Sequence, residues 1–113
     1  MASSTITKSL ASDIDTINAS LEAINAIFEN DVSTDITDLD NVPIPCVSRR
    51  ALAAGVSPNG ARLVGNIIAL GTSSYRTIQF TANIQGTGVT TFMVMKNGGT
   101  TWNPWVKVTT QSV

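Results

Sequence analysis

The large apolar side chains near the start of the chain recur in alternating steps of four and three residues. They are Leu10, Ile14, Ile17, Leu21, Ile24 and Phe28. A repeat of about 3.5 residues keeps one seam of a helix apolar, and it is typical of a coiled coil. We therefore predict a parallel coiled-coil helix over residues 1–29, with these six side chains as the core of a homotrimer.

The heptad alone leaves the choice between a trimer and a tetramer open. Leu21 at position a, followed by isoleucine at position d, shifts the preference away from dimers. Ile14 and Phe28 interrupt the pattern of a pure tetramer. An alternative is that the helix packs its apolar face on the rest of its own chain. A helix lying on a membrane surface is disfavoured, because the polar face here is acidic rather than basic.

From residue 61 onward the apolar period changes to two, which is typical of strands. Four segments, separated by turns rich in Gly, Asn and Ser, have this character: 62–70, 76–84, 89–96 and 102–109. The clearest alternation places Ile78, Phe80 and Ala82 on one face. We predict a small antiparallel β head over residues 61–113, built as a meander, and an α+β fold for the chain. The three heads would lie side by side or intertwine, so that neighbours cover the sheet edges.

Residues 30–60 are predicted to adapt the acidic helix to the head. Pro43 and Pro45 predict an extended segment, because proline and the residue before it avoid helical conformations. We expect one helical turn over residues 35–39 and a short helix over residues 48–55, which read SRRALAAG.

The adaptor also contains a group of aspartates at close spacing. They are Asp31, Asp35, Asp38 and Asp40. A calcium site is disfavoured, because the spacing lacks the alternating ligands and the closing Glu of an EF-hand loop. Two interpretations stay open: a solvated acidic turn, or a patch that pairs with the basic head of a neighbouring subunit.

Charge is divided between the two parts of the chain. All eight carboxylates lie in residues 1–40, where one lysine leaves a formal charge of −7, and residues 41–113 carry a formal +6. Apolar residues make up 42% and charged residues 13%, which indicates more apolar surface than a small monomer can bury and favours an oligomer.

Several classes of chemistry find no support in the residues. Histidine is absent and Cys46 is the single cysteine, so we expect no metal, no cofactor and no His-dependent catalysis. Cys46 is interpreted as a buried thiol, with an interchain disulfide as the alternative. The head lacks the paired carboxylates of a glycosidase and the Lys/Arg runs of a nucleic-acid-binding protein. No apolar run is long enough to insert in a membrane or to act as a signal peptide, so we expect synthesis in the cytoplasm.

The segment SSYRTIQFTANIQGTGVTTFMVMKNGGTTWNPWVKV, residues 73–108, resembles the C-terminal knob repeat of phage tail fibres and R-type pyocin fibres. The similarity rests on a strand with Gln in a Tyr-Arg-x-Gln setting, the Gly-rich turns and the closing W-x-x-W pattern, and residues 37–43 are similar to the segment that often introduces such modules. Gln79 stands one residue later than in the family pattern. The family pattern carries Arg in the third strand, where this chain reads FMVMK. The resemblance implies a homotrimeric virion fibre, made in the host cytoplasm, with a host-surface glycan as its partner.

The candidate ligand contacts are Tyr75, Arg76, Lys96, Trp102 and Trp105. Tryptophan stacks on sugar rings, but at least one of the two is expected in the core, and packing is the alternative role for both. The cations of the head would suit lipopolysaccharide phosphates or an acidic capsule. They would equally suit the acidic adaptor of an adjacent subunit, or another virion protein of the tail or capsid.

The leading hypothesis is a receptor-binding fibre protein of a tailed phage, in which three weak glycan sites act together through avidity. The alternative is a trimeric decoration or adaptor protein of the capsid or tail that has no host ligand. A cellular lectin-like module is the third class considered. No enzymatic activity is expected.

Overall fold

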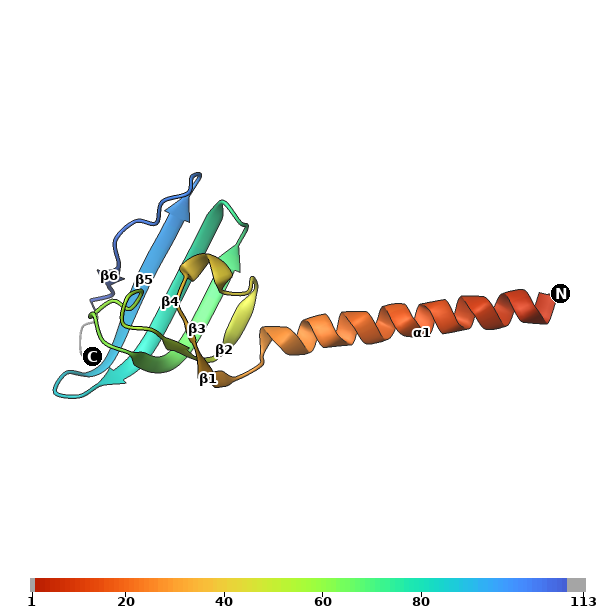
Figure 1. The fold of residues 1–113 in the computed structure, drawn as a ribbon, viewed down its shortest axis with the longest axis horizontal. Coiled ribbons are helices and arrows are strands. Elements are labelled where there is room, and N and C mark those ends of the chain that lie inside the picture. The colour runs from red at the N-terminus through yellow and green to blue at the C-terminus, as the bar shows by residue number, and fades with distance from the viewer. Residues whose placement is uncertain (1, 110–113) are drawn as a thin grey trace.

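The computed structural model describes residues 2–109, with side chains described from Ser9 onward. A single long helix, α1 (Ala2–Ile27), extends away from a β head, and the molecule measures 69 × 32 × 30 Å (Figure 1). Helix and sheet are therefore separate parts of one chain, as the change of hydrophobic period predicted. The predicted α+β class is confirmed.

The head is one six-stranded sheet whose strands follow one another in sequence order (Figure 1). The strands are β1 (Asp31–Ile36), β2 (Cys46–Leu52), β3 (Leu63–Gly71), β4 (Tyr75–Ile84), β5 (Gly88–Asn97) and β6 (Val106–Lys107). Strands β2 to β6 form an antiparallel meander. The antiparallel meander predicted for residues 61–113 is confirmed. The edge strand β1, which lies outside that range, runs parallel to β2, so the complete sheet is mixed.

The predicted helix over residues 48–55 is wrong, because most of that segment belongs to β2. All seven residues of β2 pair with β3, from Cys46 opposite Ala69 to Leu52 opposite Leu63. The alanines and arginines of this stretch favour a helix locally, but the hydrogen bonds to β3 decide the conformation. Residues 30–60 thus supply two of the six strands.

The predicted helical turn over residues 35–39 is displaced towards the C-terminus. Strand β1 continues to Ile36, and a short 3-10 helix, η1 (Leu39–Asn41), follows it. Asp38 caps η1, because its side chain accepts a hydrogen bond from the Asp40 N–H at 2.9 Å. The helical turn therefore begins directly after its N-cap residue, Asp38.

The three central strands of the meander match the predicted segments closely, and Ile78, Phe80 and Ala82 are buried on one face of β4 as predicted. The last predicted strand is shorter than expected. Two parts of this segment pair with β5: the short strand β6, and Trp102, which forms an isolated bridge to Lys96. Pro104 lies between Trp102 and β6 in the sequence. Proline has no N–H to donate to a sheet, which accounts for the gap.

The core lies on one face of the sheet, beneath η1 and the loop that follows β2. Its largest fully buried side chains are Phe80, Leu52, Ile67, Ile78, Val42 and Cys46. Leu39 of η1 belongs to the same cluster, and Trp102 and Trp105 pack against it. The prediction that Cys46 is a buried thiol is confirmed.

Candidate functional site

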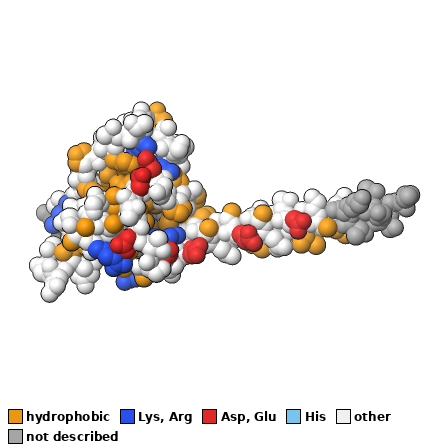
Figure 2. Space-filling model, in the orientation of Figure 1, with side chains coloured by type: hydrophobic (Ala, Val, Ile, Leu, Met, Phe, Trp, Pro, Cys, Tyr) orange, Lys and Arg blue, Asp and Glu red, His pale blue; other side chains and the backbone are white. Residues whose placement is uncertain are grey.

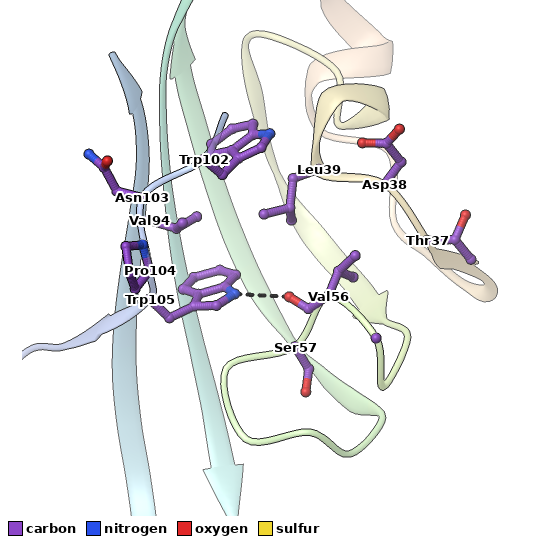
Figure 3. A pocket seen from close by; sticks show the side chains of 11 residues that line it. Thr37, Asp38, Leu39, Val56, Ser57, Val94, Trp102, Asn103, Pro104 and Trp105 are labelled. Atoms are coloured by element: carbon purple, nitrogen blue, oxygen red, sulfur yellow. Dashed lines mark hydrogen bonds between the residues drawn. The ribbon is translucent and has the colours of Figure 1, made fainter. Parts of the chain in front are cut away.

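Two tryptophans form the wall of a hollow on the covered face of the head (Figure 3). The hollow has a volume of about 340 Å³. Its apolar lining comes from Trp102, Trp105, Leu39, Val56 and Val94. Thr37, Asp38, Ser57 and Asn103 add polar groups. A concave apolar surface with a few polar groups is the usual form of a small-ligand site, and this volume suits a ligand of one or two sugar rings.

The indole N–H groups of both tryptophans are used within the protein. Trp105 Nε1 donates to the carbonyl oxygen of Val56 at 2.9 Å (Figure 3). Trp102 Nε1 donates to Oδ1 of Asp40 at 3.1 Å. Both rings are half-buried. A ligand would therefore meet the ring faces and not the indole N–H groups, and stacking on sugar rings uses those faces.

Lys96 lies beneath Trp102 and is paired with an aspartate. Its Nζ is 2.9 Å from Oδ1 of Asp40 and 5.9 Å from the centre of the Trp102 ring. The Lys96 side chain is only 9% exposed, against 43% for Asp40. The hydrogen bond from Lys96 holds the pKa of Asp40 below its ordinary value. Lys96 is therefore a neutralised cation beneath Trp102, and it does not itself line the hollow.

The other two candidate ligand contacts lie elsewhere on the sheet. Arg76 is half-buried, and its Nη1 donates to the carbonyl oxygen of Val42 at 2.7 Å. Its guanidinium thus fastens the chain beyond η1 to the sheet. Tyr75 is 61% exposed and lies opposite Asn97 at the start of β4, one residue before Arg76, which is opposite Lys96. Neither residue lines the tryptophan hollow. The structure thus brings together Trp102 and Trp105, with Lys96 below them.

Sequence reasoning missed the side of the hollow opposite the tryptophans. Thr37, Asp38 and Leu39 come from the crossover between β1 and β2, and Val56 and Ser57 come from the loop after β2. These residues carry no motif of their own. The available signal was indirect: a half-buried tryptophan needs a hydrogen-bond acceptor for its indole N–H, and a preceding loop must supply it.

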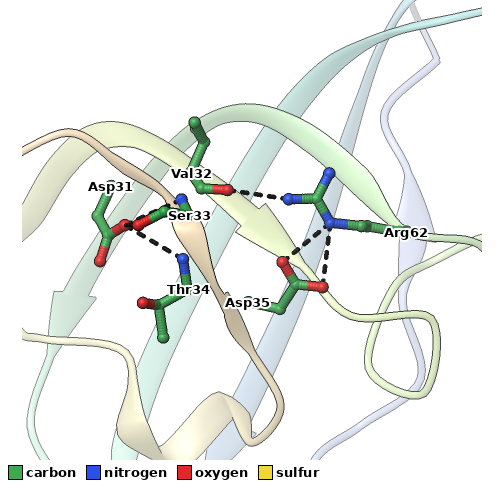
Figure 4. Close-up of polar contacts among 6 residues, drawn as sticks. All are labelled: Asp31, Val32, Ser33, Thr34, Asp35 and Arg62. Carbon is green, nitrogen blue, oxygen red and sulfur yellow. Dashed lines mark hydrogen bonds and ion pairs between the residues drawn. The ribbon is translucent and has the colours of Figure 1, made fainter.

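The acidic adaptor pairs with the basic head of its own chain. Arg62 Nε lies 2.9 and 3.0 Å from the two carboxylate oxygens of Asp35, and its Nη2 donates to the carbonyl oxygen of Val32 (Figure 4). Asp35 and Asp40 therefore pair with cations of their own chain, whereas the sequence left open a solvated turn or pairing with a neighbouring subunit. Figure 2 shows acidic and basic side chains side by side on the head.

Asp31 is held in a local turn. Its Oδ1 accepts hydrogen bonds from the Ser33 hydroxyl and from the N–H groups of Ser33 and Thr34 (Figure 4). These bonds lower the pKa of Asp31. Among the residues that the structure describes, no three acidic or cysteine side chains gather to hold a metal ion.

The six predicted core side chains form an exposed apolar stripe along α1, with Phe28 just beyond the last helical residue, Ile27. Each is between 51% and 59% exposed. Apolar side chains lie along the helix in Figure 2, with carboxylates between them. Within the described residues, α1 meets the head only near its end, where residues 23–27 lie against Pro43, Ile44 and Pro45. The stripe is therefore not packed on the chain's own sheet.

No protein family, curated protein or solved structure matches the chain. In the part of the chain that the structure describes, no helix combines the length and the apolar character needed to span a membrane.

Proposed function

We propose that the chain is a trimeric fibre protein of a tailed-phage virion, which binds a host-surface glycan through the tryptophan hollow. The observation that carries this proposal is the exposed apolar stripe of α1. The stripe runs along a helix that extends away from the head, while the head presents a ligand-sized hollow. A helical stalk that joins several such heads is the architecture of a multivalent binder.

The stripe supports self-association on energetic grounds. Moving one leucine, isoleucine or phenylalanine side chain from water into an apolar environment is worth about 1.5–3 kcal/mol. Six such side chains on one seam leave a contiguous patch that a soluble monomer rarely exposes. Side chains spaced by the heptad repeat would interlock between parallel helices, and the choice of three chains follows from the fibre resemblance.

The chemistry of the hollow favours a neutral saccharide. The described residues that line it include no lysine or arginine, and Lys96 behind Trp102 is paired with Asp40. The carboxylate of Asp38 at the hollow would repel phosphates and uronic acids. We therefore infer a neutral sugar of a surface polysaccharide, and not the charged groups of lipopolysaccharide or an acidic capsule.

Three such sites on one stalk would act together. A shallow hollow that offers two ring faces binds a single sugar weakly. Joining the sites makes the second and third contacts intramolecular, so that avidity can exceed the single-site affinity by about 10²–10⁴. The proposed mechanism therefore needs no tight individual contact.

The first test measures the mass of the purified protein by light scattering. We expect a trimer for the wild type and a monomer for Ile17→Asp/Ile24→Asp, because two carboxylates per chain would be buried in the seam. The control is Ser12→Asp/Ala19→Asp, which adds the same charge at exposed positions on the opposite side of the helix. A wild-type monomer would overturn the trimeric stalk.

The second test applies the wild-type trimer and its Trp105→Phe variant to an array of neutral and acidic glycans. We expect binding to neutral glycans that weakens in the variant. Silence of a folded trimer on the array would overturn the glycan proposal. It would favour the alternative, a trimeric decoration or adaptor protein of the capsid or tail that contacts no host.

A further inference from the structure

The sheet has a second face that no other part of the described chain covers. Six apolar side chains lie at one end of it: Val47, Ile68, Leu70, Met93, Met95 and Val106. The other end of the same face carries Arg49 beside Val64 and Val89. We refer to the first six residues as the open face. Five of them are between 40% and 59% exposed, and Met93 is half-buried. The cover formed by η1 and the loop after β2 lies over the opposite, core-bearing face (Figure 3).

Strand register gathers these residues into two adjacent rows. In the first row Val47 is opposite Ile68, which is opposite Gln79, and the row continues through Met93 to Val106. In the second row Leu70 is opposite Thr77, which is opposite Met95. Neither row contains a charged residue. The solvated face of an antiparallel sheet normally alternates to polar side chains, so these rows indicate a face that is buried in the assembled protein.

The open face adjoins the exposed stripe of α1. The end of α1 lies against residues 43–45, which lead directly into β2, and the Asn30 side chain accepts a hydrogen bond from the Arg49 N–H. Val47 on β2 belongs to the open face. Helices that associate through their stripes would therefore bring the open faces of two copies within reach of one another.

We propose that the open face is the contact surface between heads, and that it is occupied by the open faces of the other two copies of this chain, gathered around the threefold axis of the trimer. Rows without charge can meet identical rows at a symmetry axis without like-charge repulsion. The six side chains are few beside the roughly 20–30 residues per partner of a typical stable interface. Contact between the open faces therefore depends on the helices, which hold the heads close together. This inference thus rests on the proposed helical assembly.

The test introduces a thiol into the full-length chain by Ile68→Cys and measures its rate of reaction with a maleimide. Gln85→Cys, at the exposed turn between β4 and β5, is the control. Mass is measured on the same samples by light scattering. We expect an oligomer in which the thiol at position 68 reacts about tenfold more slowly than the thiol at position 85, because its reaction requires local opening. Adding Ile17→Asp/Ile24→Asp should abolish this difference.

Thr77→Cys repeats the measurement with a smaller change of side chain, and the buried thiol of Cys46 stays unreactive while the head is folded. An oligomer whose thiols at positions 68 and 77 react as fast as the control overturns the contact between heads and leaves the helical assembly standing. A wild-type monomer overturns both. Protection that arises only in assembled virions assigns the open face to another virion protein and also overturns the inference.

Discussion

Nζ of Lys96 lies 2.9 Å from Oδ1 of Asp40, although 56 residues separate the two along the chain. The same oxygen accepts the indole N–H of Trp102. One carboxylate therefore joins η1 to β5 and to the segment that carries the tryptophans. It also compensates an ammonium group that would otherwise be buried without a counter-charge, which is costly in a protein interior.

The first prediction concerns this pair. Asp40→Asn should lower the free energy of unfolding, because the ammonium of Lys96 stays buried and loses its counter-charge. Asp40→Asn combined with Lys96→Met should recover part of that loss. Urea denaturation of the single and double variants gives the coupling, and Asp13→Asn on the exposed helix serves as the control. If the losses of unfolding free energy in the single variants simply add in the double variant, the coupling between Asp40 and Lys96 is contradicted.

The second prediction concerns acid. The pKa values of Asp31 and Asp40 are lowered in the folded protein. A carboxyl group with a lowered pKa stabilises the fold above its unfolded pKa, about 3.9 for aspartate, and this stabilisation is lost as pH falls through the folded pKa. We expect the thermal unfolding temperature to be steady down to about pH 5 and to fall below pH 4.

Asp31→Asn separates the contribution of the Ser33 turn from that of the Lys96 pair. The variant should be less stable than the wild type near neutral pH and should lose less stability on acidification. Equal slopes of unfolding temperature against pH in the two proteins would show that Asp31 does not contribute.

The third prediction concerns Gly65 on β3. A Cβ atom there would meet the backbone carbonyl oxygen of Thr81, the Phe80 ring and the Cβ of Ala82. Gly65→Ala should therefore destabilise the head by about 1–3 kcal/mol, the usual cost of overpacking. Gly55→Ala is the matched control, because a Cβ there meets nothing within 4 Å. Comparable unfolding curves for the two variants would contradict the close packing of β3 on β4.

The fourth prediction separates the two roles of Trp105. Trp105→Phe keeps an aromatic ring but removes the N–H that bonds to Val56. It should cost about 0.5–1.5 kcal/mol of stability, the net worth of a typical hydrogen bond. Val56→Ala keeps the backbone carbonyl oxygen that accepts this hydrogen bond and shortens only the side chain, so it tests the lining of the hollow alone. If the hollow binds sugars, both variants should bind neutral glycans more weakly at temperatures where they remain folded, and unchanged binding would place the ligand elsewhere.

The charge distribution shows how far sequence reasoning reached. All carboxylates lie in residues 1–40 and most cations lie beyond them, and the sequence left open whether the acidic group is solvated or pairs with the basic head of a neighbouring subunit. It could not decide that Asp35 and Asp40 pair with Arg62 and Lys96 of the same chain. That outcome depends on the crossover between β1 and β2, which carries Asp40 across the sheet to β5.

The helix with its apolar stripe and the inward face of β4 could be read from the chain alone. Both depend on repeats that each residue shares with neighbours two to four positions away. Trp102 and Trp105 stood out in the same way, but the residues opposite them did not. Three features follow from contacts between distant segments: residues 46–52 form a strand, the tryptophans meet Leu39 and Val56, and one face of the sheet stays open. The physical reason is the same in each case: the deciding partners lie more than ten residues away along the chain, where local propensity carries no information.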